Sequence, residues 1–341
     1  MKRPSLRVLV LMHQERVPPV SLVGSTEKQQ EEWKTEYAVV TALRKLGHEV
    51  MPLGLWDEVR PIRDAITDFK PHIAFNLLEE FQGQPLFDQH VVAFLELSNL
   101  AYTGCNPRGL TLARDKALTK KILTYHRIDV PAFMVAPRRQ RWKRPKVLKF
   151  PLIVKSLTEE ASLGISQASV VDTDEKLQER VRFIHESIGT DAIIEQYIDG
   201  REIYVGALGN KQITVLPPWE LVLDHLPADA VHIATRKVKW DKAYQQRHKI
   251  KSQAAQLPDA MIRKITHLGR RIYKNLSLSG YARMDFRVTS DGRVFLVEAN
   301  PNPGVAPQDE FAESAQAYKL DYGKLISKLL TLGRSYKPGT Y

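Results

Sequence analysis

A predicted β-hairpin constrains the fold of this chain more than any other segment. Residues 281–304, YARMDFRVTSDGRVFLVEANPNPG, consist of two alternating runs on either side of Asp291-Gly292. Asp-Gly favours a two-residue type I′ turn, because both positions of that turn require positive φ. The segment therefore predicts two antiparallel strands with a fixed register.

The register follows from counting outward from the turn, with Ser290 opposite Arg293. This count places two carboxylates and an arginine–asparagine pair across the strands: Asp285 faces Glu298, and Arg283 faces Asn300. Side chains alternate along a strand, so one face is predicted to hold Tyr281, Arg283, Asp285, Arg287, Leu296, Glu298 and Asn300. The other face is predicted to be a core face and holds Ala282, Met284, Phe286, Val288, Phe295, Val297 and Ala299.

Two carboxylates directly opposite each other repel and destabilise a sheet. A divalent cation removes that penalty, and the hard oxygen ligands of Asp285, Glu298 and Asn300 suit Mg²⁺ or Mn²⁺. The alternative is that Arg283 and Arg287 neutralise the carboxylates on a solvated face. The hairpin alone leaves both interpretations open.

The composition is that of a globular protein of two or three domains, with 341 residues, 43% hydrophobic and 26% charged. No apolar run approaches the roughly 18 residues that span a bilayer, so no membrane partner is expected. Cys105 is the single cysteine, which excludes an internal disulfide and fits a reducing cytoplasm. The net charge of +11 raises the question of nucleic acid. The basic run at 138–146 is interpreted either as a solvated loop or as a contact surface.

Strands that alternate with helices in the first hundred residues predict a parallel sheet. Strands are expected at 6–12, 48–53 and 72–76, and helices at 34–46 and 88–98. A basic helix at 111–127 precedes a second unit with strands 151–155, 165–171 and 192–197 and a helix at 174–188. A strand-rich region at 201–223, a loop at 224–257 that covers a site, and helices at 258–276 and 320–332 complete the prediction. The expected domains are 1–107, 108–197 and 198–335, in an α/β chain that is α+β in its C-terminal part.

The ordered motifs of the chain resemble those of the ATP-grasp ligases, and within them the D-alanine–D-alanine ligase type. The resemblance extends from about Val91 to Leu330 and rests first on the D-x-(about 12)-E-x-N pattern of Asp285, Glu298 and Asn300. It implies an N-terminal parallel-sheet domain and two α+β lobes that clamp ATP, with two Mg²⁺ (or Mn²⁺) ions on the hairpin.

The resemblance also implies roles for residues that bind the nucleotide. Lys116 and Lys155 match the lysines that contact ATP phosphates, with Ser162 in the small-residue loop after Lys155. The segment IIEQYIDGREIYVGALG resembles an adenine-binding hinge, in which Glu195 accepts from the adenine amino group, Ile198 presents its backbone and Glu202 binds the ribose. Lys239 matches a phosphate-facing lysine on a mobile loop, and Lys237 is its rival.

Four departures from the family pattern concern the first substrate. The segment after strand one, HQERVPPVSLVGSTEKQQ, lacks the expected Gly-rich turn and glutamate. Ala161 and Trp240 stand where a serine and a tyrosine are expected, and residues 76–80 replace a His-Gly pair. The substrates and their stereochemistry are therefore not specified.

The function implied is ATP-dependent joining of a carboxylate to an amine through an acyl phosphate, with amino acids as the expected substrates. Phosphoryl transfer mainly needs positioning and neutralised charge. Arg283 and the backbone N–H of Gly304 are predicted to stabilise the oxyanion of the second step, with Lys239 on the phosphates. An ATP-binding module without ligase activity and a basic nucleic-acid-binding protein are the alternatives. A homodimer in the cytoplasm is a further expectation.

Overall fold

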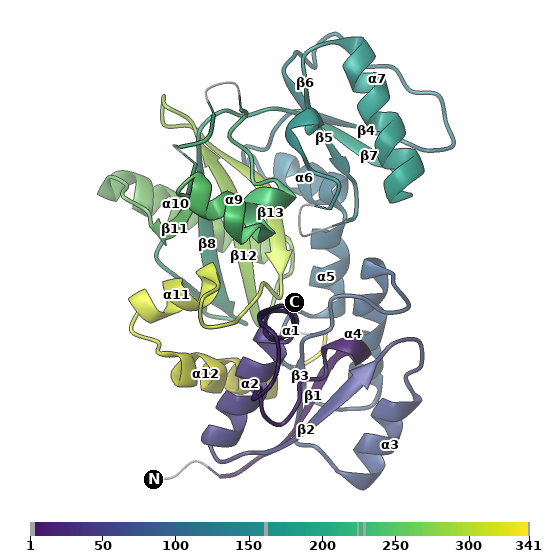
Figure 1. The fold of residues 1–341 in the computed structure, drawn as a ribbon, viewed down its shortest axis with the longest axis vertical. Helices are drawn as coiled ribbons and strands as arrows, with labels where there is room; N and C mark the ends of the chain where they lie inside the picture. The colour runs from purple at the N-terminus through teal and green to yellow at the C-terminus, as the bar shows by residue number, and fades with distance from the viewer. Residues whose placement is uncertain (1–3, 160–162, 224, 228–229, 340–341) are drawn as a thin grey trace.

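The computed structural model describes residues 4–159, 163–223, 225–227 and 230–339, apart from the side chain of Trp240. Figure 1 shows an N-terminal unit at the bottom, a central lobe at the upper right and a C-terminal lobe at the left. This arrangement has the predicted fold class, a parallel-sheet domain followed by two α+β lobes.

A parallel sheet in the order β2-β1-β3 forms the N-terminal unit. The buried apolar run VLVLM of β1 pairs with β2 in register Arg7↔Glu49 and with β3 in register Val8↔Ile73. Its elements are β1 (Arg7–His13), α1 (Glu27–Glu32), α2 (Lys34–Lys45), β2 (Glu49–Leu55), α3 (Arg60–Asp68), β3 (Ile73–Asn76) and α4 (Asp88–Leu97). Short 3-10 turns lie at Gln14–Arg16 and Pro85–Phe87.

Two helices, α5 (Pro107–Arg114) and α6 (Lys116–Tyr125), replace the single helix predicted at 111–127. The side chain of Asp115 accepts a hydrogen bond from the Leu118 N–H at 2.8 Å and so caps α6. Capping by Asp satisfies one of the free N–H groups at a helix start. The break places Lys116 at the first position of a new helix.

The central lobe is an antiparallel sheet in the order β4-β7-β5-β6, covered by α7. The predicted strand 165–171 is wrong for most of its length, because a 3-10 turn at Gln167–Ser169 leaves only two residues of strand. The bounds are β4 (Phe133–Ala136), β5 (Leu152–Ser156), β6 (Val170–Val171), α7 (Asp174–Phe183) with a π turn at Ile184–Ile188, and β7 (Ala192–Gln196).

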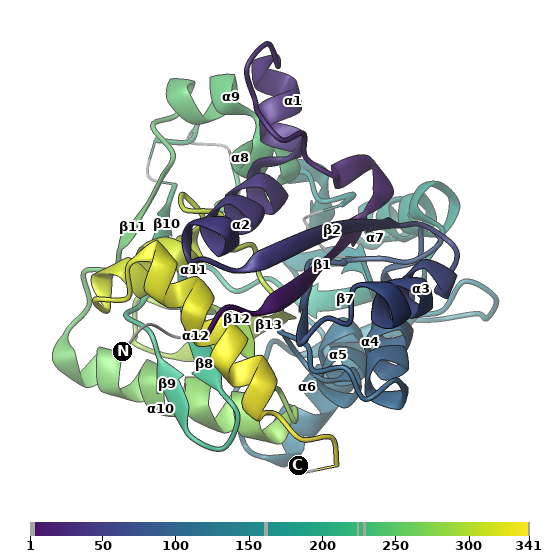
Figure 2. The ribbon, with the colours of Figure 1, turned by 90° about the horizontal axis from the view of Figure 1, so that it is seen from below.

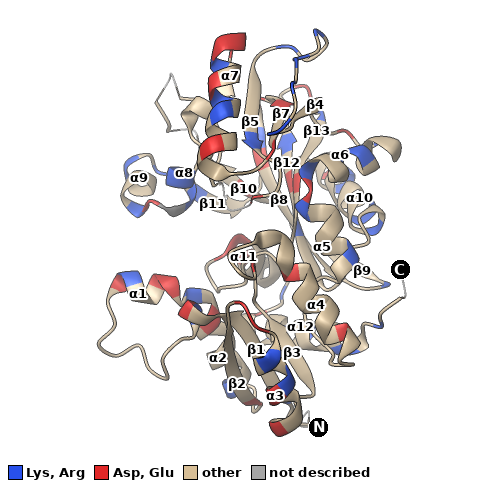
Figure 3. Ribbon diagram, turned by 90° about the vertical axis from the view of Figure 1, so that its right-hand side faces the viewer, with Lys and Arg blue, Asp and Glu red and all other residues tan. Residues whose placement is uncertain are grey.

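The basic run 138–146 lies in the loop between β4 and β5, which projects from the far end of the central lobe (Figure 3). Arg144 binds Asp174 through two hydrogen bonds of 2.7 and 2.8 Å, and Arg138 donates to the Gly189 carbonyl at 2.5 Å. Two of the six basic residues are therefore engaged in holding the loop against the lobe.

The C-terminal lobe is built on the sheet β11-β10-β8-β12-β13, with β9 paired to β8. Its strands are β8 (Arg201–Gly209), β9 (Ile213–Val215), β10 (Trp219–Val222), β11 (Lys251–Ala254), β12 (Tyr281–Val288) and β13 (Val294–Pro301). Its helices are α8 (Arg236–Trp240), α9 (Lys242–Arg247), α10 (Asp259–Asn275), α11 (Glu310–Ala317) and α12 (Tyr322–Ser335). The predicted loop over the site contains α8, α9 and β11.

The last helix completes the core of the first sheet. Val8, Val10 and Phe75 of the N-terminal sheet share one buried cluster with Ile326 and Leu329 of α12. Figure 2 shows α12 beside α2 and β1, although these elements are far apart in sequence. Among the described residues, no helix combines the length and the apolar character that crossing a membrane requires.

Candidate active site

The β12–β13 hairpin pairs the residues that the sequence predicts, although its turn differs. Asp285 lies opposite Glu298, and Arg283 lies opposite Asn300. The predicted two-residue turn is wrong: the Thr289 N–H donates to the Arg293 carbonyl at 3.0 Å, which leaves three residues in the loop. Gly292 takes φ +78° there, as a three-residue hairpin loop favours.

A β-bulge between Asp285 and Phe286 restores the predicted pairing. Phe286 faces Leu296 while Asp285 faces Glu298, so Val297 has no partner of its own. The bulge corrects two face assignments: Leu296 belongs to the core with Phe286, and Val297 lines the pocket described below. Phe295 is buried as predicted, but it pairs with Arg287 and so lies on the opposite face from the one predicted.

Asp285 is buried and held on two sides. Arg283 donates to its two carboxylate oxygens at 2.7 and 2.9 Å, and the Asn300 amide donates to Oδ2 at 3.0 Å. Burial raises the pKa of the Asp285 carboxyl, against the opposing effect of Arg283. Arg283 also lies 3.8 Å from Glu310 and over the Tyr204 ring. Arg283 therefore forms a salt bridge with Asp285, as one of the two interpretations of the hairpin sequence predicted.

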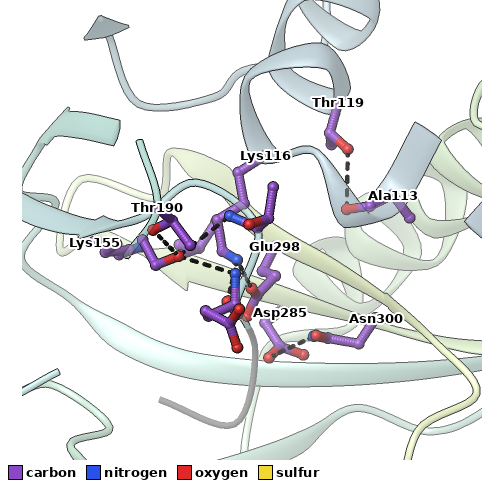
Figure 4. Close-up of polar contacts among 12 residues, drawn as sticks. Ala113, Lys116, Thr119, Lys155, Thr190, Asp285, Glu298 and Asn300 are labelled. Atoms are coloured by element: carbon purple, nitrogen blue, oxygen red, sulfur yellow. Dashed lines mark hydrogen bonds and ion pairs between the residues drawn. The ribbon is translucent and has the colours of Figure 1, made fainter. Parts of the chain in front are cut away.

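Glu298 is paired with a lysine from another lobe. Lys116 Nζ lies 3.1 Å from Glu298 Oε1 and donates to the Glu159 carbonyl at 2.6 Å. Burial alone would raise the pKa of Glu298, but Lys116, Lys155 and Lys239 outweigh it and lower that pKa to about 2. Figure 4 shows Lys116, Lys155 and Glu298 converging beside Asp285 and Asn300. The site therefore gathers ammonium groups around an ionised carboxylate.

Lys120 is a site residue that the sequence interpretation missed. Its buried ammonium lies 3.3 Å from Glu195 Oε1 and donates to the Val297 carbonyl at 2.8 Å, while Lys155 binds Glu195 Oε2 at 3.1 Å. Burial raises the pKa of Glu195, but the two lysines outweigh it and lower that pKa. The available signal was the spacing of Lys116 and Lys120, since residues four apart share a helix face.

A pocket opens between the central and C-terminal lobes, beside these charges. Its apolar walls include Ile153, Ile198, Ile233 and Phe286. Its polar lining contains five of the predicted nucleotide and metal residues and one predicted catalytic lysine: Lys155, Glu195, Glu202, Asp285, Glu298 and, on α8, Lys239. An apolar slot with a few convergent polar groups is typical of a small-molecule site.

Glu202 is fixed at the rim of this pocket. Arg287 donates to Glu202 Oε2 at 2.6 Å and to the Gly200 carbonyl at 2.8 Å, and the Tyr204 hydroxyl donates to Oε1 at 2.8 Å. Arg287 therefore orients Glu202 rather than neutralising Asp285. Lys239 lies in the pocket lining, whereas Lys237 is exposed and outside it.

Gly304, a predicted site residue, is not among the residues that line the pocket. Ser162, like its neighbour Ala161, lies outside the described residues. Gly304 is exposed and lies next to Asp309, where a Cβ built on Gly304 would come 2.6 Å from Asp309 Oδ2. Arg283, near the start of β12, and Gly304, just after the end of β13, lie at the same end of the hairpin.

The oxygen ligands on the hairpin fit Mg²⁺ only together with another ligand source. The described residues bring no group of three or more His, Cys, Asp or Glu together, and the hairpin offers two carboxylates and one amide. Mg²⁺ is commonly held by one or two carboxylates together with substrate phosphates. The donor set therefore fits a metal that enters with a nucleotide.

Two antiparallel lobes that enclose an apolar slot, with lysines and paired carboxylates at one end, define an ATP-grasp protein. The family model described as "D-ala D-ala ligase C-terminus" matches residues 122–331. The chain belongs to the D-alanine–D-alanine ligase family.

Relatives match over nearly the whole chain. An uncharacterized protein, y4sG, of Sinorhizobium fredii is 30% identical, covering 86% of this chain and 85% of its own length. A D-alanine–D-alanine ligase of Aquifex aeolicus is 28% identical, covering 96% and 100%. The crystal structure of a D-alanine–D-alanine ligase from Bacillus anthracis complexed with ATP superposes with a TM-score of 0.73 at 22% identity, covering 96% of this chain and 97% of that one.

Proposed function

We propose that this protein is an ATP-dependent ligase that joins the carboxylate of one amino acid to the amine of another. The observation that carries the proposal is the Asp285–Glu298 pair, which faces the pocket together with Lys155 and Lys239. Family membership supports the same chemistry, because relatives such as the Aquifex aeolicus protein are named as ligases.

In the first step an oxygen of the substrate carboxylate attacks the γ-phosphorus of ATP. The bond from the γ-phosphorus to the bridging oxygen breaks, and ADP and an acyl phosphate result. Phosphoryl transfer depends on positioning and charge neutralisation, which Lys116, Lys155 and Lys239 supply from three elements. Asp285, Glu298 and Asn300 would hold Mg²⁺, which would neutralise further phosphate charge.

In the second step an amine attacks the acyl carbon, loses a proton and displaces phosphate. The oxyanion that forms requires preorganised donors. Arg283, fixed by Asp285 on one side, and the Gly304 N–H are the groups we assign to it. Loss of one such donor typically lowers the rate about 10²–10³-fold.

The adenine and ribose end of the nucleotide is assigned to the hinge after β7. Ile198 and its neighbours provide apolar walls and backbone groups, and Glu202 is oriented by Arg287 for a ribose hydroxyl. Glu195 already binds two lysines, so it acts on the phosphates through them as well as on the adenine amino group.

The test is phosphate release from ATP, with and without Mg²⁺, over a panel of D- and L-amino acids and small peptides. We expect release that depends on Mg²⁺ and on one or a few amino acids, with formation of a new amide. Nucleotide binding without phosphate release under any condition would indicate a nucleotide-binding module instead. Salt-sensitive binding of DNA or RNA in place of nucleotide binding would indicate that the 138–146 loop, not the pocket, is the functional surface.

A further inference from the structure

Two successive backbone groups of β13 are tied to the segment that contains α6. The sheet order places β13 at an edge, where its outer groups have no further strand to pair with. The Leu296 N–H donates to the carbonyl of Asp129, just after α6, at 2.9 Å. Lys120, within α6, donates to the Val297 carbonyl at 2.8 Å. The segment therefore holds β13 immediately before Glu298, a predicted metal ligand.

The Val297 carbonyl lies at the β-bulge, where the pairing of β13 with β12 is interrupted. Val297 has no partner of its own on β12, so the strand pairing alone does not fix its position. A peptide group is planar, and a hydrogen bond to the Val297 carbonyl therefore fixes the orientation of the whole Val297–Glu298 peptide. That orientation constrains the direction in which the Glu298 side chain leaves the strand.

Neutralisation of Glu195 does not by itself account for Lys120. The Glu195 carboxylate lies 3.1 Å from Lys155 and 3.3 Å from Lys120, so it has two cations for one negative charge. Lys120 is only 1% exposed, and a buried ammonium costs free energy that an apolar side chain of similar volume avoids. The second ammonium needs another explanation, and its bond to the Val297 carbonyl supplies one.

Lys120 also joins the two lobes that form the pocket. Glu195 belongs to β7 of the central lobe and Val297 to β13 of the C-terminal lobe, and both line the pocket. One ammonium group therefore contacts the predicted adenine-binding glutamate and the strand that carries a predicted metal ligand.

Lys116 and Lys120 lie four residues apart on α6, but they contact β13 differently. Lys116 binds the Glu298 carboxylate itself and must release it when a metal binds there. Lys120 binds the backbone beside Glu298 and can keep that bond with the metal in place. The two lysines are therefore expected to have opposite effects on metal affinity.

We propose that Lys120 is a positioning residue that holds the bulge of β13 in place and so directs Glu298 toward the metal. The inference rests on the proposed function, from which it takes the assignment of Glu298 to Mg²⁺. Groups that orient metal ligands from behind typically contribute about 10–100-fold to metal affinity.

The experiment measures the Mn²⁺ affinity of the full chain, saturated with a non-hydrolysable ATP analogue, by electron paramagnetic resonance of the free ion. The variants are Lys120→Met, Glu298→Gln and the double variant. Lys121→Met is the matched control, because Lys121 is an exposed lysine of the same helix. Calorimetry gives the affinity of each variant for the analogue, and circular dichroism establishes that each is folded.

We expect Lys120→Met to weaken Mn²⁺ binding about 10–100-fold and Lys121→Met to leave it unchanged. Loss of a positive charge close to the site, taken alone, tightens the binding of a cation. Weaker binding therefore separates positioning from electrostatics. In the Glu298→Gln background Lys120→Met should have little further effect, because the ligand that Lys120 directs is already impaired.

Mn²⁺ binding that is unchanged or tighter in Lys120→Met would overturn the proposal. Losses that simply add in the double variant would also overturn it, because a general loosening of the structure acts independently of Glu298. If Lys120→Met does not fold, Lys120→Gln takes its place in the same cycle, since its amide stops short of the ammonium position.

Failure of this inference is distinguishable from failure of the ligase function. A wild-type protein that binds no Mn²⁺ with the analogue would refute the metal assignment and this inference together. Mn²⁺ binding that depends on Lys120 but is accompanied by no phosphate release with any amino acid would leave this inference intact and refute the ligase function.

Discussion

Lys116→Met is expected to change metal and nucleotide binding in opposite directions. Lys116 Nζ forms an ion pair with Glu298 Oε1 at 3.1 Å, and Glu298 is one of the two carboxylates available to a metal. A metal that enters alone must displace this ammonium. Phosphates that enter with the metal bind Lys116 and release Glu298. Nucleotide and metal are therefore expected to bind together in the wild-type protein.

The magnitude follows from the distance between the two groups. At 3.1 Å and an effective dielectric constant of about 20, the attraction of two unit charges is about 5 kcal/mol. Desolvation of both groups offsets most of that attraction, so a net effect of about 1.5–3 kcal/mol is expected. Without nucleotide, Mn²⁺ should bind Lys116→Met about 10–100-fold more tightly than wild type. The non-hydrolysable ATP analogue should bind it more weakly by a similar factor.

The assay is titration of Mn²⁺ followed by electron paramagnetic resonance of the free ion, with and without the ATP analogue. Lys121→Met is the matched control, since Lys121 is exposed on the same helix and should change neither affinity. Mn²⁺ binding that is unchanged or weaker in nucleotide-free Lys116→Met would refute the reasoning. Circular dichroism and the unfolding midpoint establish that each variant is folded.

Three further predictions concern single carboxylates. Glu298→Gln should abolish phosphate release with the fold intact; near-normal turnover in a folded variant would refute its assignment to the metal. Glu195→Gln should lower the free energy of unfolding by about 3–5 kcal/mol in urea denaturation, because Lys120 and Lys155 lose their buried counter-charge; a loss below about 1 kcal/mol would contradict the buried-charge account. Burial raises the pKa of Glu36, on α2, to about 7 in the folded protein, so its contribution to stability is fully present below its ordinary pKa of 4.5 and is lost as the pH rises to 7. At 1.36 kcal/mol per pKa unit, the free energy of unfolding of Glu36→Gln should rise by about 3 kcal/mol relative to that of wild type over that pH range. Parallel curves of unfolding free energy against pH for the two proteins would refute this.

The hairpin illustrates what the sequence could predict and what it could not. Alternation and the Asp-Gly pair gave the correct partners for Asp285 and Arg283, because the three-residue turn and the bulge at Val297 shift the register by one residue in opposite senses. The face of Leu296 was predicted wrongly for the same reason. No particular residue type marks a β-bulge within an alternating run, so the sequence pattern alone cannot reveal one.

Long-range pairing limited the prediction of the site in the same way. The motifs indicated Lys116, Lys155 and Glu298, but not that Lys116 pairs with Glu298 or that Lys120 and Lys155 share Glu195. These contacts join α6, β5, β7 and β13, which only the packed lobes bring together.

The packing of α12 against the N-terminal sheet has a consequence for the order of events during synthesis. One side of β1 and β3 has only part of its apolar cover, from α2, until Ile326 and Leu329 leave the ribosome. The first unit to be made is therefore among the last to be finished, and its exposed Val8, Val10 and Phe75 need protection in the meantime. A nascent chain stopped before Tyr322 should bind a hydrophobic-surface chaperone, and release should follow once α12 has emerged.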